Sequence, residues 1–224
     1  MPVDRGLLAR PTLDAARSLL GSRLVRDDAT GRRVARIVEL EAYIGIADRA
    51  SHARFGPTAR NSVMFGPPGV AYVYLVYGMY DCLNVITEPE GTAAALLVRA
   101  AAPLEGLELM RADRLAHARL RRHSADPARR AAESRRLEAL AAWRLLSGPG
   151  LVAAAFGLDR TWTGTDLCDP RSGLRLEPVP PDEPAPTILA APRIGIAYAG
   201  KPWTTHPWRF LIAGDPAVSG SGAR

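Results

Sequence analysis

The sequence predicts a single α+β domain, because strand-like runs and segments of helical composition occur together in a chain of moderate length. The chain has 224 residues, of which 47% are hydrophobic, so it can bury one sizeable core. Residues 70–77 and 80–86 are strand-like runs on either side of Gly78 and Met79, which predicts a β-hairpin. Residues 111–144 are rich in Ala, Leu, Arg and Glu, a composition typical of helices.

The first third of the chain predicts a helix, a strand and a long loop. Thr12 can cap a helix that runs to about Leu20, with Gly21 as its stop. Residues 33–40 alternate as a partly buried strand does, and Glu41 comes at its end. Residues 45–68 then lack a regular pattern. A loop of that length in a compact domain is usually functional.

The hairpin places Tyr77 and Met79 at its tip, where we expect both side chains to be exposed to solvent. A third strand is expected at 93–99, because a continuous apolar stretch there ends in a charge. The remaining expected elements are a short helix at 151–156, a Pro-rich surface excursion at 170–186, and strands at 193–197 and 208–212.

The positive charge is concentrated in one segment. The net charge of +6 suggests an anionic partner, most often a nucleic acid. Residues 111–144 contain ten arginines against four acidic residues, which accounts for the whole excess. We interpret residues 110–145 as a basic helical insert of two helices separated at Asp126 and Pro127. Ordinary solvated helix faces explain the same composition, so the charge alone does not identify a nucleic-acid enzyme.

Other features limit the compartment and the cofactors. No run of eighteen apolar residues occurs, and the amino terminus lacks the pattern of a secretory signal, so we expect a cytosolic protein without a membrane partner. Cys82 and Cys168 form no CxxC motif, which predicts reduced thiols and neither a metal site nor a disulfide framework. We expect no cofactor, and a flexible tail at about 216–224.

Residues 37–84 contain the groups that excision of a base from DNA requires. Such a reaction needs a carboxylate to activate water, a pocket for the everted base and a side chain that fills the gap in the duplex. Glu41 is the candidate base, Tyr43, His52 and Tyr74 are candidates for the pocket, and Tyr77 is the candidate wedge. Singly, each has an ordinary alternative: a surface carboxylate, a structural histidine or packed tyrosines.

The order of the motifs favours the functional interpretation. In order from about Gly6 to Asp215 they are RIVELEAY, a histidine eleven residues after Glu41, RNSVMFGPPG, YVYLVYGMYDCLN, LLVRAAAPLEG, LSGPG, and PRIGIAYAG with PWRF. Through these motifs the chain resembles the alkyladenine (3-methyladenine) DNA glycosylase family of the mammalian type, which has bacterial members. The resemblance implies a compact domain with a curved, mainly antiparallel sheet, flanking helices and a protruding β-hairpin.

The resemblance also implies a role for individual residues. Glu41 matches the family's general base, Arg99 the arginine that helps to hold the attacking water, and Ile194 the residue whose carbonyl contacts that water. Tyr43, His52 and Tyr74 match the residues around the flipped base, and Asn84 matches the asparagine that excludes normal guanine by a clash. Tyr77, with Met79 beside it, matches the residue that enters the duplex. These roles imply a monomer that acts on double-stranded DNA containing a damaged purine.

Lys201 is the only lysine, which predicts a monofunctional enzyme with water as the nucleophile. A glycosylase that also cuts the backbone usually forms a Schiff base through a lysine or an amino-terminal amine. Pro2 is the remaining candidate amine, but the four-cysteine zinc module of the formamidopyrimidine glycosylases is absent from the sequence.

Some points stay open at this level. Glu39 shares a strand face with Glu41, and two close carboxylates raise one pKa, so Glu39 is a candidate to tune Glu41. Leu40, the long basic insert and His206 before Pro207 depart from the family pattern, and His206 affects a phosphate contact. A non-catalytic nucleic-acid-binding module of related fold and a small-molecule hydrolase are the rival interpretations. The lesion preferred among 3-methyladenine, 7-methylguanine, hypoxanthine and ethenoadenine is left open.

Overall fold

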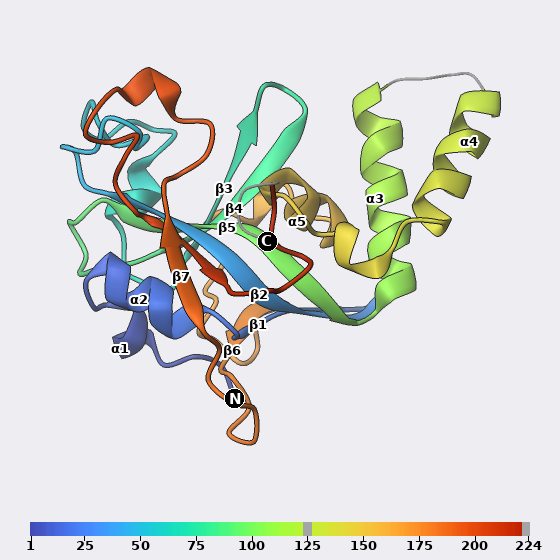
Figure 1. Cartoon of the computed structure of the whole chain (residues 1–224), viewed down its shortest axis with the longest axis horizontal. Coiled ribbons are helices and arrows are strands. Elements are labelled where there is room, and N and C mark those ends of the chain that lie inside the picture. The colour runs from blue at the N-terminus through green and yellow to red at the C-terminus, as the bar shows by residue number, and fades with distance from the viewer. Residues whose placement is uncertain (123–126, 221–224) are drawn as a thin grey trace.

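An eight-stranded antiparallel sheet that does not close into a barrel forms the centre of the molecule (Figure 1). The computed structural model describes residues 1–122 and 127–220. Six strands follow the order β3-β4-β5-β2-β1-β6, and β8 pairs with both β2 and β7. The expected α+β domain with a mainly antiparallel sheet and flanking helices is therefore confirmed. In the described residues no helix is long and apolar enough to cross a membrane.

The elements follow one another along the chain in a mixed order. The strands are β1 (Arg23–Asp28), β2 (Gly31–Ile44), β3 (Ala71–Val76), β4 (Tyr80–Ile86), β5 (Ala94–Glu105), β6 (Leu174–Glu177), β7 (Ile188–Ala191) and β8 (Arg209–Ile212). The α-helices of the described ranges are α1 (Arg5–Leu8), α2 (Thr12–Leu19), α3 (Leu107–Arg122), α4 (Pro127–Glu138) and α5 (Pro149–Ala155). Short 3-10 turns occur at Ser62–Phe65, Ala142–Arg144, Arg160–Trp162 and Ala197–Ala199.

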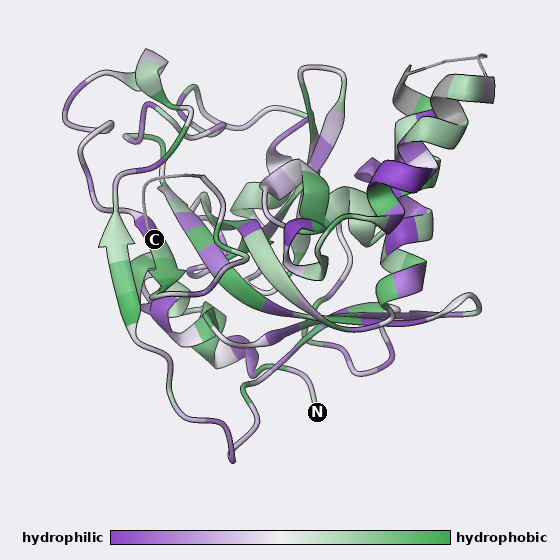
Figure 2. Ribbon diagram, turned by 45° about the vertical axis from the view of Figure 1, so that its right-hand side comes forward, coloured by the Kyte–Doolittle hydropathy of each residue, from purple (hydrophilic) through white to green (hydrophobic). Residues whose placement is uncertain are grey.

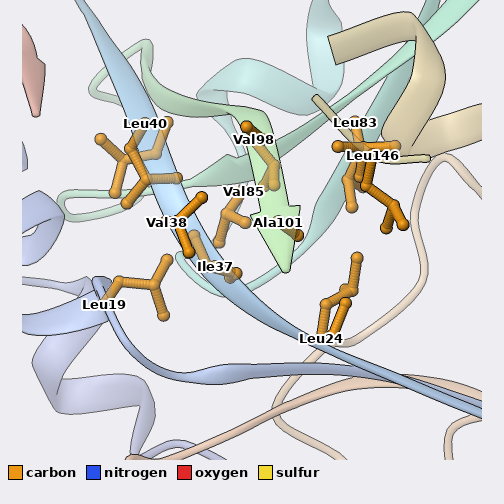
Figure 3. Packing of buried hydrophobic residues seen from close by; sticks show 14 of the residues in the cluster. Leu19, Leu24, Ile37, Val38, Leu40, Leu83, Val85, Val98, Ala101 and Leu146 are labelled. Carbon is orange, nitrogen blue, oxygen red and sulfur yellow. The ribbon is translucent and has the colours of Figure 1, made fainter. Parts of the chain in front are cut away.

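The long strands β2 and β5 are covered on both faces. Ile37 and Val38 are neighbours in β2 and both are fully buried, although successive side chains of a strand point to opposite faces. Helix α2 packs on β2 and β5, and α5 packs on β4 and β5. Figure 3 shows the resulting core, in which Leu19 of α2 and Leu83 of β4 contribute to one cluster with the centre of β2. The core thus holds the middle of β2 rigidly.

Three sequence predictions about local structure are wrong. Thr12 is the first helical residue rather than the cap, and its hydroxyl bonds to the side chains of Thr87 and Glu88, because it is buried against that turn. Strand β2 continues to Ile44, so Glu41 lies inside the strand and not at its end. Residues 193–197 do not form a strand. The strand in this region is β7, which precedes them and pairs with β8.

The hairpin is confirmed, and the segment predicted to be a helical insert contains two helices. Strands β3 and β4 pair in register around a three-residue turn, with Val76 opposite Tyr80. Tyr77 and Met79 at the tip are 88% and 53% exposed. Helices α3 and α4 form the insert, and the proposed break at Asp126 lies outside the described residues. The loop at 45–68 contains only one short 3-10 turn, as expected.

Two features go beyond what the sequence predicts. Strands β1 and β6 pair with each other, and β6 lies inside the segment expected to be a surface excursion. Part of the expected flexible tail is packed: Ala217, Val218 and Ser219 are buried, and the Ser219 amide donates a hydrogen bond to Glu39. The prediction of a flexible tail is therefore wrong for residues 217–219. Residues 221–224 lie outside the described residues.

Candidate active site

Glu41 lies in a part of β2 that is paired with neighbouring strands on both sides. In the sheet, Glu41 pairs with Leu97 of β5 on one side and with Arg209 of β8 on the other. The backbone is therefore fixed by strands on both sides, and the Glu41 side chain is fully buried. A carboxylate in this position costs free energy unless polar groups surround it.

Three groups meet the Glu41 carboxylate: Tyr43 from the same strand, and Arg99 and Ile194 from distant parts of the chain. Oε1 accepts a hydrogen bond from the backbone N–H of Ile194 at 2.7 Å and lies 3.3 Å from Nη1 of Arg99. Oε2 accepts from the Tyr43 hydroxyl at 2.9 Å. Burial raises the pKa of Glu41 above its ordinary value of 4.5, while Arg99, the Ile194 amide and Tyr43 act in the opposite direction.

Glu39 forms a second buried carboxylate site beside the first. Its Oε1 lies 3.3 Å from Nε of Arg99 and 3.0 Å from Nη1 of Arg209, and its Oε2 accepts from the Ser219 amide at 2.7 Å. Two carboxylates and two guanidinium groups thus form one buried cluster, with Arg99 between Glu39 and Glu41. The negative charge of Glu39 also raises the pKa of Glu41, by less than burial does.

An aromatic pocket adjoins Glu41 through Tyr43. The predicted residues Tyr43, His52, Tyr74 and Asn84 are brought together in its lining. The His52 and Tyr74 rings meet edge to face, with centroids 4.3 Å apart. The lining is completed by residues that the sequence patterns do not single out: Ala50, Met64, Tyr72, Ala95 and Tyr198.

His52 is held in the pocket as a neutral ring. Its Nδ1 lies 3.2 Å from the Tyr72 hydroxyl. Burial, together with the nearby positive charges of Arg60 and Arg54, lowers the pKa of His52 to about 4. Near neutral pH the imidazole is therefore uncharged. The pocket wall that it forms does not repel a cationic ligand.

The orientation of Asn84 is fixed by the hairpin backbone. Asn84 of β4 lies opposite Tyr72 of β3 in the register of the two strands. The Nδ2 group donates to the carbonyl oxygens of Tyr72 at 3.1 Å and Cys82 at 3.3 Å. Because both amide hydrogens are engaged by the backbone, the side chain forms a fixed part of the pocket wall.

A buried ion pair joins the two loops that border the site. Arg193 binds Asp48 in a bidentate geometry, with distances of 2.6 and 2.9 Å, and both side chains are fully buried. The Arg193 guanidinium also lies 4.8 Å from the centroid of the Tyr43 ring. This pair anchors the loop that carries His52 to the segment that carries Ile194. Its partners are far apart in sequence, so no local pattern could have indicated it.

The tip residues are not part of the pocket lining. Tyr77 and Met79 are exposed at the hairpin tip and are not among the residues that line the pocket. Ile194 meets Glu41 through its amide, and the role expected for its carbonyl stays a prediction.

Comparison with known proteins gives matches along nearly the whole chain. The family model of methylpurine-DNA glycosylase (MPG) matches residues 6–216. A Methanocella arvoryzae protein named "Putative 3-methyladenine DNA glycosylase" is 46% identical over 222 residues, which cover 98% of this chain and 96% of that protein. A Streptomyces avermitilis protein of the same name is 43% identical, over 97% of this chain and 91% of that protein. Glu41 and the pocket residues all lie within the range that the family model matches.

Proposed function

This chain belongs to the methylpurine-DNA glycosylase family, whose members hydrolyse N-glycosyl bonds in DNA, and we propose that Glu41 activates the water molecule for this reaction. The observation that carries the proposal is a buried carboxylate, held on three sides, at the border of an aromatic pocket. In the proposed step Glu41 takes a proton from water while the water oxygen attacks C1′ of the deoxyribose. The N-glycosidic bond breaks, and its electrons leave with the purine.

The aromatic pocket receives the everted purine. Tyr43, His52 and Tyr74 provide ring faces and edges, and a cationic methylated purine gains about 0.5 to 2 kcal/mol from each favourable contact with an electron-rich ring. The neutral state of His52 supports this role, since a charged imidazole would repel the same ligand. Such lesions also have a weakened glycosidic bond.

Two further residues are assigned to recognition of the duplex. Asn84, fixed by two backbone carbonyls, excludes normal guanine by a clash with its exocyclic amino group. Tyr77, exposed at the hairpin tip, enters the space that the flipped nucleotide leaves. We also propose that the protein acts as a monomer, because Arg99, Tyr43 and Ile194 are sufficient to hold the Glu41 carboxylate.

We propose that the enzyme is monofunctional. Lys201 is the only lysine, and it is exposed in the segment after the 3-10 turn Ala197–Ala199. Pro2, the other candidate amine, precedes Val3, whose amide bonds to β6. Strand β6 is the edge of the sheet opposite the hairpin strand β3, so Pro2 is far along the sheet from the pocket. Water is therefore the nucleophile in this proposal.

The decisive experiment is single-turnover excision of hypoxanthine from duplex DNA by Glu41→Gln. We expect a loss of about 10²-fold or more in rate, with lesion-duplex affinity retained, because the amide keeps the volume but cannot accept the proton. Glu90→Gln, which changes an exposed glutamate, is the matched control and should act at the wild-type rate.

Excision by Glu41→Gln at the wild-type rate would remove Glu41 from the mechanism. Wild-type protein should also be assayed on four duplexes that carry 3-methyladenine, 7-methylguanine, hypoxanthine or ethenoadenine. A protein that binds all four duplexes and excises none would instead be a binding module.

A further inference from the structure

Two adjoining cavities lie between the helix pair α3–α4 and the rest of the domain. The first is lined by Met79 and Tyr80 of the hairpin, by residues of α3 and α4, and by α5. The second is lined by the segment after α4 and by Val218 and Gly220. Arg114 and Arg136 line both cavities, and Arg144 lines the second. We refer to the surface formed by Arg114, Arg136 and Arg144 as the basic cavity.

The basic cavity has an excess of positive charge. Glu133 is the one carboxylate among the lining residues of the two cavities. Within the described ranges Arg136 and Arg144 form no ion pair, and the Arg144 guanidinium lies 4.8 Å from the centroid of the Trp143 ring. Arg114 uses Nη1 to donate to the Leu145 carbonyl at 3.2 Å. Arg136 and Arg144 are exposed, so their guanidinium N–H groups are accessible to an anion.

The walls of the cavity are firmly built. Nε of Arg33 in β2 bonds Asp113 of α3 at 2.6 Å, which ties the helix to the sheet. The Tyr80 ring stacks on His117 of α3, with centroids 5.2 Å apart. Helix α5 packs so closely on this ring that a Cβ atom at Gly150 would come within 2.6 Å of Tyr80. The arginines are therefore presented from a fixed frame beside the hairpin.

The basic cavity lies next to the proposed wedge. Met79 belongs to the hairpin tip and lines the first cavity, while its near neighbour Tyr77 is 88% exposed. In Figures 1 and 2 the hairpin and the helix pair project from the sheet toward the same side, and Figure 2 shows hydrophilic residues along both helices. A duplex that lies over the tip would pass close to these arginines.

We propose that the basic cavity binds phosphodiester groups of duplex DNA on one side of the nucleotide that Tyr77 displaces. Arginine is suited to this ligand, because its planar fork of donors matches phosphate oxygens in a bidentate geometry. Contacts of this kind fix the position of the duplex without reading its sequence. The inference rests on the proposed function, since it assumes the wedge role of Tyr77.

The test measures how the affinity for an undamaged duplex depends on salt concentration. It compares the wild type with Arg136→Ala, Arg144→Ala and the double variant. Each lost phosphate contact should reduce the slope of log K against log[salt] by about 0.9. The double variant should therefore lose about twice as much slope as either single variant. Arg10→Ala, which removes an exposed arginine before α2 that forms no ion pair in the described residues, is the control and should keep the wild-type slope. Lysine at both positions should restore most of the slope.

A slope for the double variant equal to that of Arg10→Ala, in protein with the wild-type melting temperature, overturns the proposal. The position of the phosphate contacts is tested with lesion duplexes that are shortened on one side of the lesion at a time. The difference in salt slope between the double variant and the wild type should disappear when one particular side is shortened, and should persist when the other side is shortened. These measurements are independent of catalysis. Lost excision by the wild type would remove the proposed function, whereas an unchanged slope with intact excision would remove only the basic cavity.

Discussion

The ionisation of Glu41 determines how the reaction should depend on pH. Burial raises the pKa of this carboxyl above 4.5, so it becomes protonated at a higher pH than an exposed glutamate does. A protonated carboxyl cannot accept a proton from water. Excision of hypoxanthine should therefore decline as the pH falls through the raised pKa of Glu41. Single-turnover rates measured between pH 4 and 8 check this, and an acid limb with a midpoint at or below 4.5 contradicts the burial argument.

Asn84 should control discrimination against undamaged guanine. Asn84→Ser shortens the side chain and removes the amide that the carbonyls of Tyr72 and Cys82 hold in place. Room for the 2-amino group then opens, and release of normal guanine should rise relative to wild type, while activity on lesions falls. The measurement is guanine release from undamaged duplex. Unchanged release by a folded variant would mean that Asn84 has only a structural role.

The sequence indicates the residues that line the pocket more readily than it indicates the buried contacts that fix their positions. Glu41, Tyr43 and His52 fall within a short stretch of recognisable spacing, so sequence patterns are enough to select them. Asp48 and Arg193 escape such patterns, because an isolated loop aspartate and a distant arginine become informative only when the fold joins them. The contact of the Ile194 amide with Glu41 is also formed by tertiary structure alone.

At the scale of elements, the exposed hairpin tip allows the proposed role of Tyr77 in DNA recognition to be tested separately from stability. Tyr77→Ala should lose stacking worth about 1 to 3 kcal/mol, which weakens lesion-duplex binding about 5- to 150-fold. The melting temperature should stay nearly unchanged, because the side chain is 88% exposed and buries little area. Tyr77→Phe keeps the ring and serves as the control.

Lesion-duplex affinity and melting temperature should be measured for both hairpin variants. Equal affinity of Tyr77→Ala and wild type would remove the wedge role. A large fall in melting temperature would instead assign Tyr77 to the core.

Strand boundaries are predicted less well than strand existence, for identifiable reasons. The alternating pattern of β2 predicts a strand only to Leu40, whereas pairing with β5 extends the strand to Ile44, and β8 pairs with it on the other side as far as Glu41. Residues 193–197 have an apolar composition like that of a strand, but Gly195 adopts a φ of 78° and the Ile194 amide binds a side chain instead of a neighbouring strand. Composition does not distinguish these two uses of the backbone.

At the scale of the whole molecule, the C-terminal segment stabilises the domain. Deletion of residues 217–224 removes the buried Val218 and the Ser219 amide that binds Glu39. Lost apolar burial of about 1.5 to 3 kcal/mol and an unsatisfied buried acceptor of about 1 to 3 kcal/mol should together lower the free energy of unfolding by about 3 kcal/mol or more. Urea denaturation measures this change.

Val218→Ala is the companion variant, because it loses part of the packing but keeps the backbone donor to Glu39. It should be destabilised less than the deletion. An unchanged midpoint for the deletion would show that the segment contributes nothing to stability.

The long sequence separation between Glu41 and its partners has a consequence for synthesis of the protein on the ribosome. A chain emerges from its amino terminus, so Glu41, the pocket residues Tyr43 and Tyr74, and the hairpin are all made before Arg193, Ile194 and Ser219. A nascent chain that ends before residue 193 has these groups but lacks Tyr198 of the pocket and the segment that completes the carboxylate cluster. Assembly of the groups around Glu41 is therefore a late event. A ribosome that stalls midway releases a fragment in which the proposed site for cutting glycosidic bonds is incomplete.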